Sequence, residues 1–309
     1  MKVSVALCTY NGAPYIAEQL DSILNQTVIP DAIIICDDIS SDETLKIITQ
    51  YQEKHSQIKI FLNDNNLGFI KNFEKAIQLC TQDIIIISDQ DDTWEHNKVE
   101  EIIKYFEENA QYDGVFHDLR LIGEEVGSTH YLAWKNIDYQ SIINSIQNNV
   151  LFIDLMKKGS FILGCALAIR QKSLERHQLK NFTFAHDYYI ALKLSSQDKL
   201  GFIPKALSTY RLHEKQVYGL RYQPNKNKET LSEKDEYFRA HVWSNLKVVE
   251  KYQELNPHQD VKQTKYYSNF ILERNSYLKR LNFFERKIYI AKCIKHKYLD
   301  LKTIDLITL

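Results

Sequence analysis

The chain has 309 residues, with 39 Lys and Arg against 40 Asp and Glu and 44% hydrophobic residues, which is the composition of a soluble globular protein of one or two domains. A formal net charge of -1 gives the whole molecule no attraction for nucleic acid, so no nucleic-acid partner is expected. No apolar run reaches the ~18 residues of a membrane-spanning helix, and the first residues do not resemble a signal peptide, so a cytoplasmic protein is predicted.

Short apolar segments in the N-terminal part of the chain predict buried strands, because they are β-branched and bounded by turn or polar residues. These predicted strands are Val3–Leu7, Ala32–Cys36, Ile58–Leu62 and Ile84–Ile87. The segments between them carry apolar residues at helical spacing. Alternating strands and helices predict an α/β fold, with a mostly parallel mixed sheet and helices on both faces.

The composition changes near residue 220. All nine Gly lie at or before Gly219, and the sequence after it is charged, aromatic and free of Gly. Residues 1–222 are therefore predicted to form one domain, and residues 223–309 a C-terminal helical region. The five Cys are odd in number and form no CxxC pair, so we interpret them as reduced structural thiols.

Ligands of α/β sheets bind at the carboxyl ends of the strands, and acidic residues stand there in this sequence. Asp89-Gln90-Asp91-Asp92 follows the all-Ile strand directly. Three carboxylates so close together repel one another unless a cation or hydrogen-bond donors keep them ionised. Mg²⁺ and Mn²⁺ prefer carboxylate oxygen, so the pattern predicts a divalent cation. A solvated acidic turn or helix N-cap is the alternative.

A second acidic pair, Asp37-Asp38, follows the second strand. Helix capping explains Ser40, Ser41 and Asp42, because a helix that begins there needs side-chain oxygens for its free N–H groups. It does not explain the pair. A carboxylate at a strand end can accept a hydrogen bond from a pyrimidine imide or a ribose hydroxyl, so the pair favours a nucleotide site.

Four motifs follow one another along the chain: Val5-Ala6-Leu7-Cys8-Thr9-Tyr10-Asn11-Gly12, Asp37-Asp38-Ile39-Ser40-Ser41-Asp42-Glu43-Thr44, Asn66-Leu67-Gly68-Phe69-Ile70-Lys71-Asn72-Phe73 and Ser88-Asp89-Gln90-Asp91-Asp92-Thr93-Trp94. In this order they resemble the motifs of family 2 inverting glycosyltransferases of the GT-A fold, and the resemblance implies that residues 1–222 form the catalytic domain. The last motif, with Tyr210-Arg211-Leu212-His213, resembles the bacterial rhamnosyltransferase-like branch, which builds surface polysaccharides. The resemblance implies sugar transfer from a nucleotide-diphosphate sugar to a glycan or lipid-linked glycan acceptor, with Mn²⁺ or Mg²⁺ as cofactor.

The resemblance also implies roles for individual residues. Those implied at the nucleotide sugar are Thr9, Tyr10, Asn11, Asp37, Asp38, Lys71, Asp89, Gln90 and Arg211. Those implied at the metal are Asp89, Asp91 and His213. Asp187, which precedes an apolar helical run, is implied as the general base, with an N-cap of that helix as the alternative. The segment 71–73 departs from the family, because many members carry an Arg where this chain has Lys71 and Phe73.

Other classes of protein share parts of this pattern. Asp89-Gln90-Asp91-Asp92-Thr93 fits the nucleophile loop of haloacid-dehalogenase-like, Mg²⁺-dependent phosphatases, although that loop normally ends the first strand of its domain. A GT-A-like nucleotidyltransferase needs a Gly-rich, Arg-containing loop after the first strand, where this chain offers Gly12 alone. A non-catalytic nucleotide-binding protein is the third alternative.

The C-terminal region contains a basic stretch. Between Arg274 and Lys302 lie nine basic and two acidic residues, interleaved with apolar ones. A basic amphipathic helix suits an anionic bilayer surface, so peripheral contact with the inner face of the cell membrane is expected. A solvated helix face, or a face packed on a partner subunit, fits equally well. The oligomeric state stays open, with a homodimer as one option.

Overall fold

The computed structural model describes residues 1–123, 130–135, 137–213 and 247–254, together with Pro257, Val261, Glu285 and Ile288. The chain divides into two compact units, one made of Met1–Leu155 and Ser160–Tyr222, the other of Met156–Gly159 and Gln223–Leu309. The predicted domain boundary and most of the basic C-terminal stretch lie outside the described residues. Every helix within the described residues is too short or too polar to span a lipid bilayer.

The N-terminal half of the first unit alternates strands and helices, as the sequence predicts. Its elements are β1 (Val3–Thr9), α1 (Ile16–Leu24), β2 (Ala32–Asp37), α2 (Thr44–Lys54), β3 (Ile58–Leu62), α3 (Gly68–Leu79) and β4 (Ile84–Ser88). Each predicted strand is confirmed, and three of them extend one or two residues further at the carboxyl end. Every side chain of β4 is buried, since both faces of the sheet are covered there.

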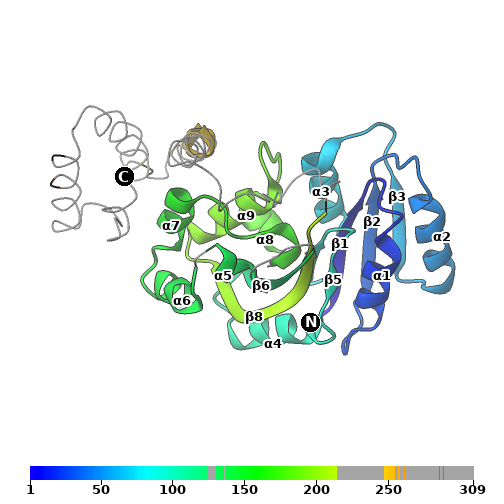
Figure 1. The fold of residues 1–309 in the computed structure, drawn as a ribbon, viewed down its shortest axis with the longest axis horizontal. Coiled ribbons are helices and arrows are strands. Elements are labelled where there is room, and N and C mark those ends of the chain that lie inside the picture. Colours follow the sequence, from blue (N-terminus) through cyan, green and yellow to red (C-terminus); the bar gives the residue numbers. More distant parts are fainter. Residues whose placement is uncertain are drawn as a thin grey trace. The chain divides into compact units, whose positions relative to one another are not determined.

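The order of these strands fixes where a ligand can bind. They are parallel, in the order β3-β2-β1-β4. The chain steps outward from β1 to β3 and then returns past β1 to β4, so right-handed crossovers place α1 and α2 on one face and α3 on the other (Figure 1). The direction of winding reverses between β1 and β4. Such a switch point is where open α/β sheets bind ligands at their carboxyl edge.

The remaining elements complete an eight-stranded mixed sheet in the order β3-β2-β1-β4-β7-β6-β8-β5. They are β5 (Thr93–Trp94), α4 (Lys98–Glu108), β6 (Gly114–Ile122), α5 (Tyr131–Trp134), α6 (Tyr139–Gln147), α7 (Leu151–Lys158), the 3₁₀ turn η1 (Gly164–Ala166), β7 (Leu167–Arg170), α8 (Ser173–Arg176), α9 (His186–Ser195) and β8 (Leu200–Arg211). Strand β7 is antiparallel to β4 and β6, whereas β8 is parallel to β6. The long strand β8 curves strongly (Figure 1).

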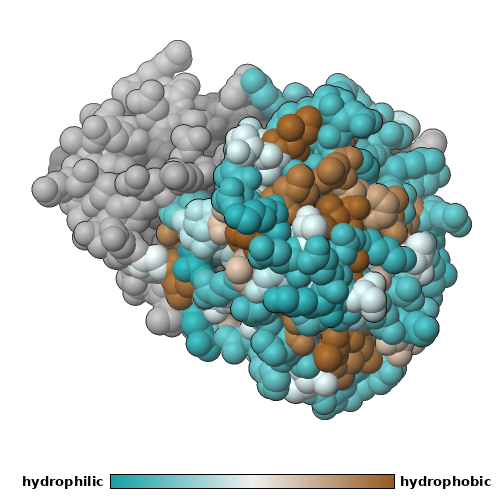
Figure 2. Space-filling model, turned by 90° about the vertical axis from the view of Figure 1, so that its right-hand side faces the viewer, coloured by the Kyte–Doolittle hydropathy of each residue, from teal (hydrophilic) through white to brown (hydrophobic). Residues whose placement is uncertain are grey.

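The core lies between the sheet and its helices. Ile33, Ile35 and Ile86 are fully buried against helices that include α1 and α4. Strand β3 is the outermost strand on one side of the sheet, and Figure 2 faces this side of the unit. It shows apolar areas separated by hydrophilic surface, and Leu62 at the end of β3 is among the exposed large apolar residues.

Candidate active site

The loop after β1 is tied to the loop after β2 at the carboxyl edge of the sheet. Thr9 Oγ1 donates a hydrogen bond to Asp37 Oδ2 at 2.7 Å. Ser40 donates to the same carboxylate from its backbone N at 2.9 Å and from Oγ at 2.6 Å. Asn11 N donates in turn to Ser40 Oγ at 2.9 Å. Three residues predicted at the nucleotide sugar, Thr9, Asn11 and Asp37, therefore lie on two connected loops.

Asp38, also predicted at the nucleoside, holds the start of α3. Its carboxylate accepts from Leu67 N at 2.8 Å, from Gly68 N at 2.9 Å and from Asn63 Nδ2 at 2.7 Å. Asp37 is 2% exposed and Asp38 is 3% exposed, and each accepts from three donors of the chain. A carboxylate offers about four acceptor sites, so each can still accept from one further donor.

Lys71 lies apart from this network, on α3. Its ammonium pairs with Glu74 at 2.6 Å, and its side chain is half exposed. That ion pair spans one turn of the helix and contributes little to stability at an exposed position. Within the described part of the chain, the contacts of Lys71 do not join it to the predicted aspartates.

Tyr10 and Gln90, both predicted at the nucleotide sugar, contact each other. Tyr10 N donates to Gln90 Oε1 at 2.9 Å, and Gln90 Nε2 donates to Tyr10 O at 3.0 Å. The side chain of Tyr10 remains 45% exposed. The loop after β1 is thus bonded to the loop after β4 across the switch point.

The loop after β4 gathers the three carboxylates. Burial raises the pKa of Asp89 well above its ordinary value, and the charges of Asp92, Asp91 and Asp187 raise it further. Burial, followed by the charge of Asp91, raises the pKa of Asp92 to about 7. Arg211 N donates to Asp92 Oδ1 at 3.2 Å, while the buried Asp92 Oδ2 has no hydrogen-bond partner among the described residues. The carboxylates of this loop therefore repel one another, and the charge of the buried Lys98 offsets that repulsion only in part.

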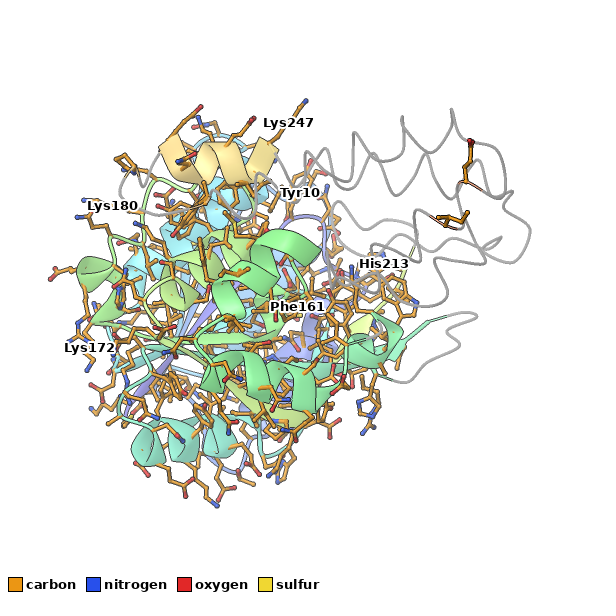
Figure 3. The ribbon with its side chains drawn as sticks, turned by 90° about the vertical axis from the view of Figure 1, so that its left-hand side faces the viewer. Tyr10, Phe161, Lys172, Lys180, His213 and Lys247 are labelled. Carbon is orange, nitrogen blue, oxygen red and sulfur yellow. The ribbon has the colours of Figure 1, made fainter. Side chains whose placement is uncertain are left out.

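The end of β8 meets this loop. Nε2 of His213 lies 2.8 Å from Oδ2 of Asp91, so two predicted metal ligands 122 residues apart are in contact. Arg211 Nε donates to the carbonyl oxygen of Asp91 at 3.1 Å, and its guanidinium pairs with Glu18 at 2.7 Å. The ring of Tyr15 lies 4.8 Å from that of His213, measured between centroids. Figure 3 labels Tyr10 and His213, which come from the loops after β1 and β8.

Asp187 lies in the first turn of α9, one residue inside the helix. The N-cap position belongs to Ala185, so the capping alternative does not hold in its simple form. Gly164 N donates to Asp187 Oδ2 at 3.1 Å, and Tyr188 N donates to Oδ1 at 2.6 Å. Burial raises the pKa of Asp187 to about 6, although these two hydrogen bonds lower it. Gly164 precedes Cys165, whose sulfur lies within 4.8 Å of carboxylate oxygens of Asp89 and Asp92, so Asp187 is bonded to the turn beside the acidic loop.

The donor atoms of this site suit a hard divalent cation. Asp91 and His213 offer a carboxylate oxygen and an imidazole nitrogen already in contact. A carboxylate oxygen from Asp89, another from Asp92 and the sulfur of Cys165 all lie within 4.8 Å of one another. Mg²⁺ and Mn²⁺ favour the oxygen ligands of this set over the thiol. The buried Asp92 Oδ2, which has no hydrogen-bond partner in the part of the chain that the structure describes, is a further acceptor that a cation could satisfy.

Sequence reasoning missed Lys98, which lies beneath the site. Its side chain is 0% exposed, and Nζ donates to Cys165 O and to Ser208 Oγ, both at 2.8 Å. Nζ also lies 4.1 Å from the ring centroid of Trp94. Trp94 is itself buried and belongs to the core. Burial lowers the pKa of Lys98 to about 7. A lysine at the start of a helix carries no local signal that separates it from a solvated one.

His186 precedes Asp187 in the sequence, and sequence reasoning gave it no role. Its ring stacks on Phe73 with 4.0 Å between centroids, and neither ring nitrogen has a hydrogen-bond partner among the described residues. Burial lowers its pKa to about 3, so the ring is neutral. A Cβ added at Gly164 would lie 2.6 Å from His186 Nε2. The ring thus leaves no room for a side chain at Gly164, whose N–H donates to Asp187.

Replacing Gly164 with Ala is expected to displace this turn. The stacked ring of His186 cannot move away easily, so overpacking should cost about 1–3 kcal/mol of the free energy of unfolding. Activity should fall with it, since the Gly164 N–H leaves Asp187. Denaturant unfolding and turnover measure both effects. In a His186→Ala background the added methyl group meets no ring, so an undiminished cost there would contradict this explanation.

A doubly wound half-sheet with an Asp-x-Asp loop at its switch point, continued by a curled mixed half, is the GT-A fold of transferases that use nucleotide sugars. The sequence model for glycosyl transferase family 2 matches residues 4–178, more than half of the chain, so the chain belongs to that family. The protein is a glycosyltransferase.

Individual relatives agree with this assignment. The chain is 29% identical over 259 residues to a glycosyltransferase of Haemophilus influenzae, covering 80% of this chain and 77% of that protein. It is 27% identical over 227 residues to the dTDP-rhamnosyl transferase RfbG of Shigella flexneri, covering 69% and 73%. The alignments to both relatives extend over most of the chain.

Solved structures share the fold. The first 349 residues of S. aureus TarS, in complex with UDP, superpose with a TM-score of 0.56 at 16% identity, covering 94% of this chain and 78% of that one. The mannosyltransferase PcManGT of Pyrobaculum calidifontis, in complex with GDP-Man and Mn²⁺, gives 0.54 at 15% identity, covering 99% and 85%. At these identities the likeness is one of fold.

Proposed function

We propose that this glycosyltransferase moves a sugar from a nucleotide-diphosphate sugar to a hydroxyl of a glycan or lipid-linked glycan acceptor, with inversion at the anomeric carbon and with Mn²⁺ or Mg²⁺. One observation carries the proposal. Asp91 contacts His213, and Asp89 and Asp92 of the same loop lie within 4.8 Å of Cys165, in the turn whose Gly164 N donates to Asp187.

Asp187 serves as the general base in this proposal. Inversion requires the acceptor hydroxyl to attack the anomeric carbon from the face opposite the leaving group, as its proton passes to a base. The hydrogen bonds from Gly164 N and Tyr188 N fix the carboxylate without protonating it. A pKa of about 6 leaves Asp187 ionised at neutral pH and still basic enough to take a proton.

The other groups act on the leaving diphosphate. Asp89, Asp91 and His213 would hold the divalent cation, which supplies charge neutralisation to the diphosphate when bound. Arg211 places a guanidinium beside Asp91, where it can hydrogen-bond phosphate oxygens. The loops that carry Thr9, Tyr10 and Asn11 and the pair Asp37 and Asp38 would receive the nucleoside.

The donor sugar is narrowed only by similarity. RfbG is a dTDP-rhamnosyl transferase, and the structures superposed above, with a further TarS structure, contain UDP, UDP-GlcNAc or GDP-Man. Donors with dTDP-deoxyhexoses are therefore the first to test. The basic C-terminal stretch is proposed to contact an anionic membrane. Most of its residues lie outside the described part of the chain.

The phosphatase alternative and the non-catalytic alternative are not favoured. The Asp89-Gln90-Asp91-Asp92 loop follows β4, after three strands that carry their own motifs, whereas a dehalogenase-like nucleophile loop ends the first strand. The family match and the glycosyltransferase relatives also weigh against both.

A thermal-shift screen tests the proposal. UDP-, dTDP- and GDP-sugars are added with and without Mn²⁺, and one nucleotide class is expected to raise Tm only when the cation is present. A ligand that binds the folded state alone stabilises it by RT ln(1 + [L]/Kd), and each kcal/mol shifts Tm by roughly 2–4 °C in a domain of this size. A flat response to every donor would contradict the proposal.

A further inference from the structure

The amide of Gln90 forms two hydrogen bonds with the main chain of Tyr10. Its oxygen accepts from Tyr10 N at 2.9 Å, and its nitrogen donates to Tyr10 O at 3.0 Å. The two bonds join residues 80 positions apart, and they define which end of the amide is which. Gln90 therefore holds the main chain of Tyr10 from one side as a neighbouring strand would.

Gly12 makes this pairing sterically possible. A Cβ at position 12 would lie 2.1 Å from Gln90 Oε1 and 2.4 Å from its Cδ, so the amide occupies the space that any other residue would fill. The main chain of Gly12 is anchored independently. Its N–H donates to Thr44 Oγ1 at 2.8 Å, and its carbonyl accepts from Tyr15 N and Ile16 N at the start of α1. The glycine cannot move aside to admit a side chain.

The pairing connects the loop after β1, which is proposed to bind the nucleoside, to the loop after β4, which is proposed to bind the diphosphate. Gln90 lies between Asp89 and Asp91, and Tyr10, which follows β1, is 45% exposed. A donor that contacts both loops is bound well only if their separation is fixed beforehand. We propose that Gln90 is a positioning residue that locks the Tyr10 loop to the Asp89–Asp91 loop, so that the nucleoside and diphosphate parts of the donor bind as one unit. This inference rests on the proposed function.

A double-mutant cycle distinguishes positioning from direct contact with the donor. Gln90→Ala removes the amide, whereas Gly12→Ala leaves Gln90 in place but pushes its amide out of the pairing. Both variants are expected to raise KM for the donor roughly tenfold, with kcat changed far less, as about one or two lost hydrogen bonds predict. The double variant should be no worse than the worse single variant, because the second change removes nothing further. Gln52→Ala, another half-buried Gln that bonds a carbonyl at 3.3 Å, is the matched control and should leave KM unchanged.

Two results would overturn the inference. If the effects of the two substitutions on KM are additive, the substitutions do not act by breaking the same pairing. A raised KM in Gln90→Ala with a normal KM in Gly12→Ala would assign Gln90 a direct contact with the donor. Hydrogen exchange of the peptide that contains Tyr10 is measured without ligand, and it should accelerate in both variants. Faster exchange in a protein that binds no nucleotide sugar would refute the proposed function while upholding the pairing.

Discussion

Replacing Asp187 with Asn is expected to reduce kcat by about a hundredfold or more while donor affinity stays near that of the wild type. The Asn side chain has nearly the same size, and its oxygen can still accept the hydrogen bond from Gly164 N. It cannot take the proton of the acceptor hydroxyl. Steady-state kinetics and a separate measurement of donor Kd give the two quantities.

The control for this variant is Asp138→Asn. Asp138 also accepts a backbone hydrogen bond at a helix start, from Ser141 N at 2.8 Å, but it is the N-cap of α6 and is no part of the proposed site. Its substitution should leave kcat unaltered. A folded Asp187→Asn protein that loses nucleotide binding instead of turnover would show that the role assigned to Asp187 is wrong.

The pH dependence follows from the same carboxylate. Burial raises the pKa of Asp187 to about 6, and only its ionised form can act as a base. The value of kcat/KM should therefore rise as the pH increases through about 6. The residual activity of Asp187→Asn should lack this acid limb. A wild-type profile that is flat between about pH 5 and about pH 7, roughly one pH unit either side of that pKa, would contradict the role of Asp187 as the base.

Replacing Asp91 with Ala is expected to lower turnover by two or more orders of magnitude. The substitution removes the carboxylate that contacts His213 and leaves the diphosphate without its neutralising ion. Mn²⁺ affinity, measured by electron paramagnetic resonance of the free ion, should fall in parallel, and this measurement does not depend on turnover. Wild-type activity should likewise be lost in EDTA and return on addition of Mn²⁺ or Mg²⁺.

Asp64→Ala is a suitable comparison, because Asp64 is an exposed aspartate in the loop between β3 and α3. It should keep both Mn²⁺ affinity and turnover. Full activity of the wild type in EDTA, or unchanged Mn²⁺ affinity in Asp91→Ala, would remove the metal from the proposal.

The N-terminal half of the fold was predictable because its signals are local. Short β-branched runs separated by segments of helical period define β1 to β4, and parallel pairing then brings their carboxyl ends together. The motifs after β1, β2 and β4 could be placed at one edge on this basis. That Asp91 and His213 share a site was implied only by the resemblance, since nothing local connects positions 122 residues apart.

The curled half was not predictable in the same way. Strand β6 pairs with the distant β8 and shifts register on both sides of Asp118. Asp118 is a buried carboxylate satisfied by Tyr139 OH at 2.7 Å and Leu132 N at 3.0 Å, partners that no periodicity indicates. Lys98 is likewise buried because distant acceptors surround it. Such polar side chains are buried because distant residues supply their hydrogen-bond partners, whereas sequence patterns assign polar residues to the surface.

The carboxylates after β2 show a subtler limit. Asp37 and Asp38 were both assigned to the nucleoside, yet each spends three acceptor sites on the protein's own loops. A carboxylate that shapes a binding loop and one that contacts a ligand have the same residue type at the same strand end. Sequence alone therefore predicts where such a site lies, but it does not show which of its residues contact the ligand and which shape the loop.

The most direct test of the central claim is proton NMR of donor hydrolysis, with water taking the place of the acceptor. The purified protein is incubated with Mn²⁺ and the donor class that stabilises it, and the anomeric signals are followed before mutarotation. We predict that the donor is consumed slowly, that the first sugar released has the anomeric configuration opposite to that of the donor, and that Asp187→Asn abolishes the reaction. Release of the sugar with retained configuration, or an intact donor in the presence of acceptor glycans as well as water, would contradict the account.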